Sequence, residues 1–74
     1  MQNVNVNLIE ALARARVHSN DSIDGRNITG AQLLTLCAYD IVTDVYPEAD
    51  VRLIGKPAQA FEAEVFEFEV IREG

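Results

Sequence analysis

Residues 60–71 alternate between acidic and apolar side chains, in the run AFEAEVFEFEVI. A period of two places successive side chains on opposite faces of a β-strand, so the pattern predicts a strand with one buried and one solvated face. The apolar phase shifts by one residue at Val65-Phe66, where a bulge would restore the register. A helix over residues 58–71 is the alternative, and it would scatter the acidic side chains. The predicted strand runs from Ala60 to Ile71, and its solvated face carries a ladder of four carboxylates, those of Glu62, Glu64, Glu67 and Glu69.

A first helix is predicted from Leu8 to about His18. Asn7 can cap it, and Glu10 at the third helical position completes a capping box. Glu10 and Arg14 are spaced to pair across one helical turn.

A second helix is predicted to begin at Thr29, which forms a capping box with Gln32, and to end before Pro47. Its apolar positions recur at the spacing of a helix that is buried along its length. These positions are Leu34, Ala38, Ile41 and Val45. Further apolar residues widen the apolar face of this helix, so we expect the helix to be central in the fold or covered by other elements on a second side.

Two further short strands complete the predicted fold. Residues 51–54 form one, and Pro57 interrupts the chain after it, because proline cannot donate to a strand ladder. Residues 3–6 could add a short N-terminal strand. We therefore expect a single α+β domain over residues 1–74, with two helices packed on a small antiparallel β-sheet in the order α-α-β-β, preceded by that N-terminal strand.

The chain is acidic, with twelve acids against six lysines and arginines and a net charge of -6. Residues 1–39 balance at zero, so the whole excess falls in residues 40–74. Nucleic-acid binding requires clustered lysine and arginine, so no direct contact with nucleic acid is expected.

Little in the sequence suggests catalysis. Cys37 lies among leucines, which indicates an inert buried thiol, and His18 ends a helix, where its charge suits the helix dipole. One cysteine and one histidine cannot form a zinc cluster. We therefore expect no enzyme, no cofactor and no metal. No signal peptide and no stretch of about 20 apolar residues is present, so a cytoplasmic protein without a membrane segment is expected.

The loop between the two helices has the spacing of a calcium loop in its first half. Asn20, Ser22 and Asp24 stand at ligand positions, with Gly25 at the turn. The twelfth position is Ala31, where an EF-hand requires a bidentate glutamate, so a capped polar loop explains these residues better.

Within the same loop, Asp21-Ser22-Ile23 resembles the Asp-Ser-Leu motif of acyl carrier proteins. That resemblance implies an all-helical fold and phosphopantetheine on Ser22, and it covers three residues. Gly25 and the cap at Thr29 stand where the family begins a helix, so the carrier function is the weaker alternative.

We expect a non-enzymatic protein-binding module. Residues two apart on one face of a strand are about 6–7 Å from each other, comparable to successive phosphates, so the ladder could occupy a basic groove that normally holds nucleic acid. The most concrete version is a small inhibitor of the kind that phages encode against host nucleases or RNA-guided defence complexes. The expected partner-binding residues are Glu62, Glu64, Glu67, Glu69, Asp40 and Asp44.

The alternative function is a structural or assembly protein. A domain of this size buries only about 60% of its unfolded surface, so docking or self-association can supplement its stability. Pairing of the sheet edge with a second copy would make a homodimer.

Overall fold

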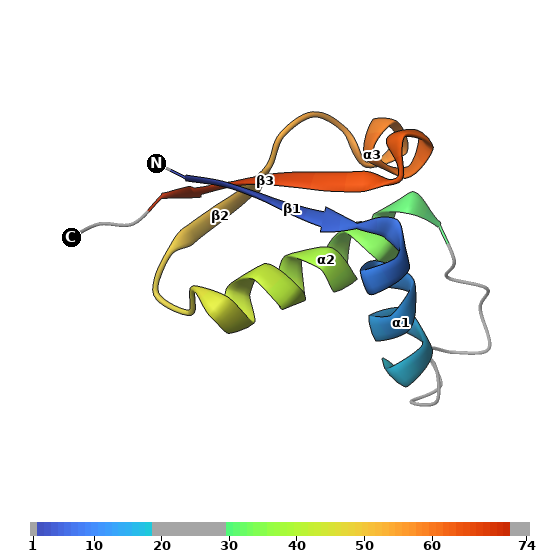
Figure 1. Ribbon diagram of the computed structural model, residues 1–74, viewed down its shortest axis with the longest axis horizontal. Helices are drawn as coiled ribbons and strands as arrows, with labels where there is room; N and C mark the ends of the chain where they lie inside the picture. The colour runs from blue at the N-terminus through green and yellow to red at the C-terminus, as the bar shows by residue number, and fades with distance from the viewer. Residues whose placement is uncertain (1, 19–29, 72–74) are drawn as a thin grey trace.

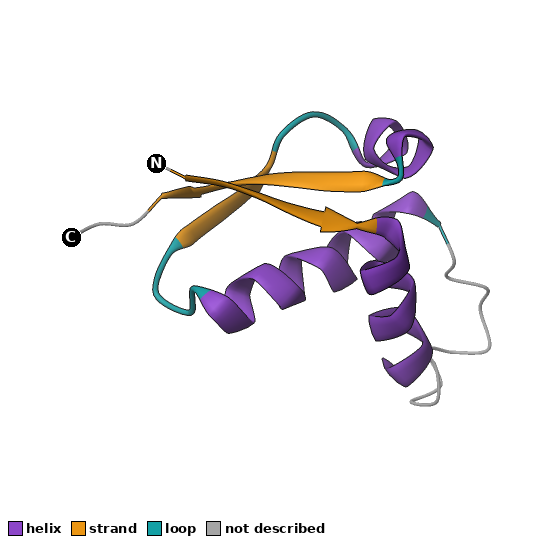
Figure 2. Cartoon of the chain, viewed as in Figure 1, coloured by secondary structure: helices purple, strands orange, loops and turns teal. Residues whose placement is uncertain are grey.

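The computed structural model describes residues 2–18 and 30–71. Its elements follow in the order β1 (Gln2–Asn7), α1 (Leu8–His18), α2 (Ala31–Val45), β2 (Asp50–Leu53), α3 (Pro57–Ala63) and β3 (Val65–Ile71). The three strands form one antiparallel sheet in the order β1-β3-β2, so the last strand is central (Figures 1 and 2). The predicted α+β class is confirmed. The predicted count of two helices was wrong, and the order α-α-β-β does not match, because a third helix lies between the last two strands; the N-terminal strand that the sequence allowed is present.

The N-terminal strand and first helix follow the predicted local signals. β1 extends the predicted strand by one residue at each end, and α1 begins at Leu8 as expected. The backbone N–H of Glu10 donates to Asn7 Oδ1 at 2.9 Å, so the asparagine caps the helix as predicted. The backbone hydrogen bonding between β1 and β3 continues one residue past β1, because Leu8 N–H donates to the Glu64 carbonyl at 2.9 Å.

The second helix begins later than predicted. Its N-cap is Gly30, which makes no side-chain cap hydrogen bond, and the predicted cap Thr29 lies outside the described residues. The helix ends at Val45, before Pro47, as expected. The side chains that it buries are Leu34, Cys37, Ala38 and Val42. Val45 was predicted to belong to this buried stripe, but it lies at the helix end and 66% of its surface is exposed.

The prediction of one strand over residues 60–71 was wrong for its first half. Residues 57–63 form α3, and Glu64 then adopts the left-handed conformation, with φ 60° and ψ 23°, before β3 begins. Pro57 occupies the first helical turn, and Lys56 N–H donates to Gln59 Oε1 at 3.1 Å, so the helix start is well formed. The phase shift at residues 65–66 is therefore a change from helix to strand. No bulge is needed, because the β1–β3 register is continuous.

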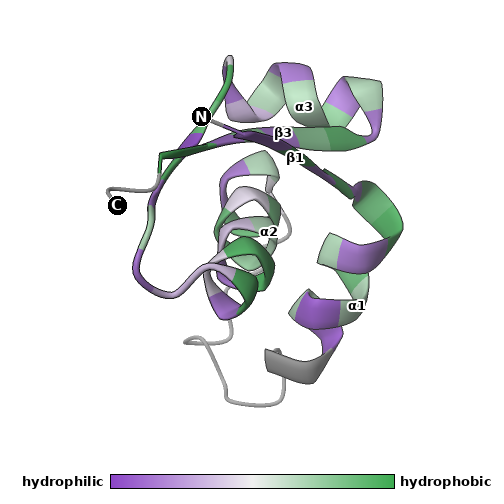
Figure 3. Ribbon diagram, turned by 60° about the vertical axis from the view of Figure 1, so that its left-hand side comes forward, coloured by the Kyte–Doolittle hydropathy of each residue, from purple (hydrophilic) through white to green (hydrophobic). Residues whose placement is uncertain are grey.

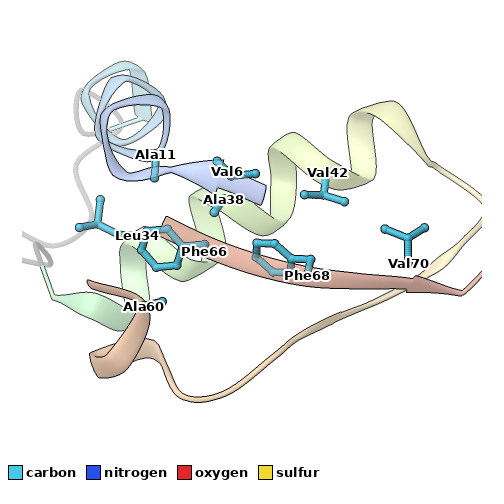
Figure 4. Close-up of a cluster of buried hydrophobic side chains, with 9 residues drawn as sticks. All are labelled: Val6, Ala11, Leu34, Ala38, Val42, Ala60, Phe66, Phe68 and Val70. Carbon is cyan, nitrogen blue, oxygen red and sulfur yellow. The ribbon is translucent and has the colours of Figure 1, made fainter. Parts of the chain in front are cut away.

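The core lies between the sheet and the two longer helices. α1 and α2 pack side by side on one face of the sheet (Figures 1 and 3). Alternate residues of β3 face them, and Phe66, Phe68 and Val70 are fully buried. Figure 4 shows this cluster, whose remaining members are Val6, Ala11, Leu34, Ala38, Val42 and Ala60. Ala60 is the one buried residue of α3, so this short helix is attached to the core at a single position.

Candidate docking surface

The face of the sheet opposite α1 and α2 is lined by polar side chains. On the central strand, Glu67 and Glu69 alternate with the buried phenylalanines and so point to this side. Asn5 lies opposite Glu67 and Asn3 opposite Glu69 on β1, and Arg52 lies opposite Glu69 on β2. We refer to these five residues as the outer sheet face. The asparagines and Arg52 were not among the predicted site residues, although the alternation in NVNVN already placed Asn3 and Asn5 on one face.

Glu69 is neutralised within the chain. Its Oε2 lies 3.0 Å from Nη2 of Arg52, and only 17% of its side chain is exposed, against 70% for Arg52. Glu67 is exposed, and no cation among the described residues lies within ion-pair distance of it. Glu67 is therefore the acidic group of the central strand that is available to a partner.

Glu62 and Glu64 are not on the sheet. Glu62 is exposed on α3, and Glu64 is the exposed residue that joins α3 to β3. The predicted ladder of four carboxylates on one strand was therefore wrong, and with it the phosphate-like spacing of Glu62 and Glu64. These two residues instead stand at the start of β3, three residues or more along the chain from Glu67, where α3 adjoins the sheet (Figure 1).

Asp40 and Asp44 lie on α2, on the helical side of the molecule. Asp44 Oδ2 accepts a hydrogen bond from Nη2 of Arg14 at 2.8 Å, and this contact raises the pKa of the arginine. Arg14 was predicted to pair with Glu10, but this ion pair joins α1 to α2 instead. The structure thus separates the six predicted residues into three places: the outer sheet face, the α3–β3 junction and α2.

Cys37 is buried, as the sequence predicted, and it makes no disulfide. Burial, and to a lesser degree the neighbouring charge of Asp40, raises the pKa of its thiol above the ordinary value. A thiol held protonated and away from solvent is a poor nucleophile. This explains how an acidic domain can carry a free cysteine without a reactive site.

We expect Cys37 to react slowly with Ellman's reagent in the folded protein. Reaction requires local opening of α2, so the rate should fall about a hundredfold below that in concentrated urea, which corresponds to an opening free energy of ~2.8 kcal/mol. The measurement is the absorbance of released thionitrobenzoate over time. Equal rates in buffer and in urea would contradict the burial of this side chain.

Within the described part of the chain, no three histidine, cysteine or carboxylate side chains come together as a metal site. The loop residues with calcium-like spacing (Asn20, Ser22 and Asp24) and the carrier-like Asp21-Ser22-Ile23 lie outside the described residues. Of the helices that the structure describes, none has the length and apolar character required to cross a bilayer.

Comparisons with known protein families, with curated proteins and with solved structures found no match.

Proposed function

We propose that this chain is a non-enzymatic binding protein that docks on a positively charged surface of a protein partner. The observation that supports the proposal is a series of three exposed carboxylates that lie just before the start of β3 and on its first half. Glu62 and Glu64 stand at the α3–β3 junction and Glu67 on the outer sheet face, and none of them has an ion-pair partner among the described residues. We call these three residues the acidic end.

Electrostatics favour such docking in two ways. The net charge of -6 attracts a basic surface over distance and accelerates encounter. The two ion pairs between described residues, Arg52–Glu69 and Arg14–Asp44, use carboxylates outside the acidic end. The acidic end therefore needs no internal rearrangement before it meets lysine and arginine side chains.

Basic protein surfaces commonly serve nucleic-acid binding. The proposed partner is accordingly a protein with such a surface, and this chain would act as its inhibitor by excluding the nucleic acid. An inhibitor directed against a host nuclease or an RNA-guided defence complex is the most specific form of this proposal.

The test compares two double variants with the same total charge. Glu64→Lys/Glu67→Lys changes the acidic end, and Glu10→Lys/Glu48→Lys changes two exposed acids outside it and outside the predicted partner-binding residues. Each replaces two acids by two bases, so the net charge becomes -2 in both. Proteins captured from a bacterial lysate by the wild type at low salt are identified, and the affinity of each variant for the purified partner is then measured by calorimetry.

We expect the acidic-end variant to lose binding, while the control keeps most of it. Wild-type affinity should fall about tenfold or more between 0.05 and 0.5 M salt, because exposed charge pairs are screened over a Debye length. Equal losses of affinity in the two variants would indicate that the overall negative charge of the chain drives binding and that no defined surface does. Undiminished binding by the acidic-end variant would contradict the proposal.

A further inference from the structure

The outer edge of β1 leaves backbone hydrogen-bonding groups without a neighbouring strand in the described sheet. The backbone hydrogen bond from Leu8 N–H to the Glu64 carbonyl continues the β1–β3 register. In an antiparallel pair, every second residue makes such bonds to the neighbouring strand. The backbone groups of Val4 and Val6 therefore face β3. Those of Asn3 and Asn5 face away from the sheet, where a further strand can bind them.

The two edges of the sheet differ in the protection that they carry. β2 is four residues long and carries Asp50 and Arg52, both of which discourage strand addition. β1 is six residues long, contains no proline or charged residue, and keeps a regular register along its whole length. In a chain with a net charge of -6, β1 is thus the edge that another strand can approach most easily.

We propose that two copies of this chain pair through β1 in antiparallel orientation, so that their sheets join into one six-stranded sheet. The segment Asn3-Val4-Asn5 within β1 is the same when read in either direction. An antiparallel second copy therefore places asparagine opposite asparagine on the outer face and valine opposite valine on the core side. Pairs of matching amides and of β-branched side chains both stabilise neighbouring strands.

The register of the β1–β1 pairing follows from which backbone groups of β1 are still free. Only Asn3, Asn5 and Asn7 direct backbone groups outward, and Asn7 is the N-cap of α1, so its carbonyl is committed to the first hydrogen bond of the helix. A two-fold axis at Val4 pairs Asn3 of one copy with Asn5 of the other, twice over. Val4 is only half-buried in one copy, and it then packs against its counterpart across the axis.

Like charge does not prevent this pairing. The acidic groups of the neighbouring strand, Glu67 and Glu69, lie on β3, one strand inward from the edge. In the joined sheet the two central strands are three strand spacings apart, roughly 14 Å, which exceeds the Debye length of about 8 Å at physiological ionic strength. Repulsion between the two carboxylate rows is therefore largely screened.

Sedimentation equilibrium and amide hydrogen exchange of the full chain test the proposal. The mass should rise with concentration from 8.2 kDa toward twice that value. The amides of Asn3 and Asn5 should become protected over the same concentration range, whereas those of Val4 and Val6 are protected throughout. A chain that remains monomeric up to about 1 mM, a Kd too weak for a specific dimer, overturns the proposal. So does a dimer in which the Asn3 and Asn5 amides still exchange freely.

Variants at Asn5 separate this edge from other contacts. Asn5→Pro removes an outward N–H, and Asn5→Asp adds a like charge at the joined edge of each copy, beside Glu67 on β3. Each should weaken the dimer about tenfold or more, because each copy loses an edge hydrogen bond or gains a repulsive contact. Asn5→Thr keeps the N–H and should dimerise like the wild type.

Circular dichroism establishes that the variants are folded, and Asn5→Asp remains informative if the proline variant does not fold. Persistence of the dimer in folded Asn5→Asp overturns the proposal. Salt distinguishes this contact from the docking proposed above, since backbone pairing should keep or gain affinity between 0.05 and 0.5 M salt while charge-driven docking loses it.

Discussion

Replacing Phe68 with alanine is expected to leave most of the protein unfolded near room temperature. Phe68 is fully buried on the central strand, opposite Val4 on one side and Leu53 on the other, and its ring centroid lies 6.3 Å from that of Tyr39. Truncating a buried phenylalanine costs about 3–5 kcal/mol in lost burial and cavity formation. A single core in a domain of this size supplies roughly the same amount, about 3–5 kcal/mol. The variant therefore has little or no free energy of unfolding left.

Phe61→Ala is the matched control. Phe61 lies on α3 with 41% of its surface exposed, so the same truncation should cost about 1–2 kcal/mol. Urea unfolding followed by circular dichroism measures both variants. Comparable losses of unfolding free energy at the two positions would contradict the separation of residues 57–63 from the strand. A single strand over residues 60–71, with a bulge at residues 65–66, would place both phenylalanines on one apolar face.

Elements with local signals could be predicted from the sequence. Alternation indicated β1, and the side chain of Asn7 indicated where α1 begins. α3 was missed because Phe61 and Ala63 alternate with Glu62 and Glu64 as in a strand, although the alanines at residues 58, 60 and 63 favour helix. Pro57, followed two residues later by Gln59, was the available helix-start signal.

The candidate site was harder to predict than the fold. Whether a carboxylate is free depends on which cation the fold brings to it, and Asp44 and Glu69 meet arginines 30 and 17 residues away in the sequence. Local spacing contains no such information. Glu64 presents a different difficulty, because glycine or asparagine usually occupies the left-handed position after a helix. Nothing in the sequence indicated that a glutamate would stand there.

Substitutions at Glu64 are expected to reverse the stability order that a continuous strand would produce. With φ at 60°, Glu64→Gly should be about 1 kcal/mol more stable than Glu64→Ala, because glycine has no Cβ to clash in the left-handed region. Glu64→Val should be about 1 kcal/mol less stable than the alanine variant, because a β-branched side chain is disfavoured there. All three variants remove the same charge, so the comparison isolates the backbone.

A strand at this position predicts the opposite order. Valine would then be the most stable of the three variants and glycine the least, since valine favours strands and glycine weakens them. The midpoints of urea unfolding, measured on the purified chain at equal m-values, decide between the two orders. A midpoint for Glu64→Val at or above that of Glu64→Ala would restore the continuous strand. It would also return Glu62 and Glu64 to the sheet face beside Glu67, and the acidic end would again be a ladder.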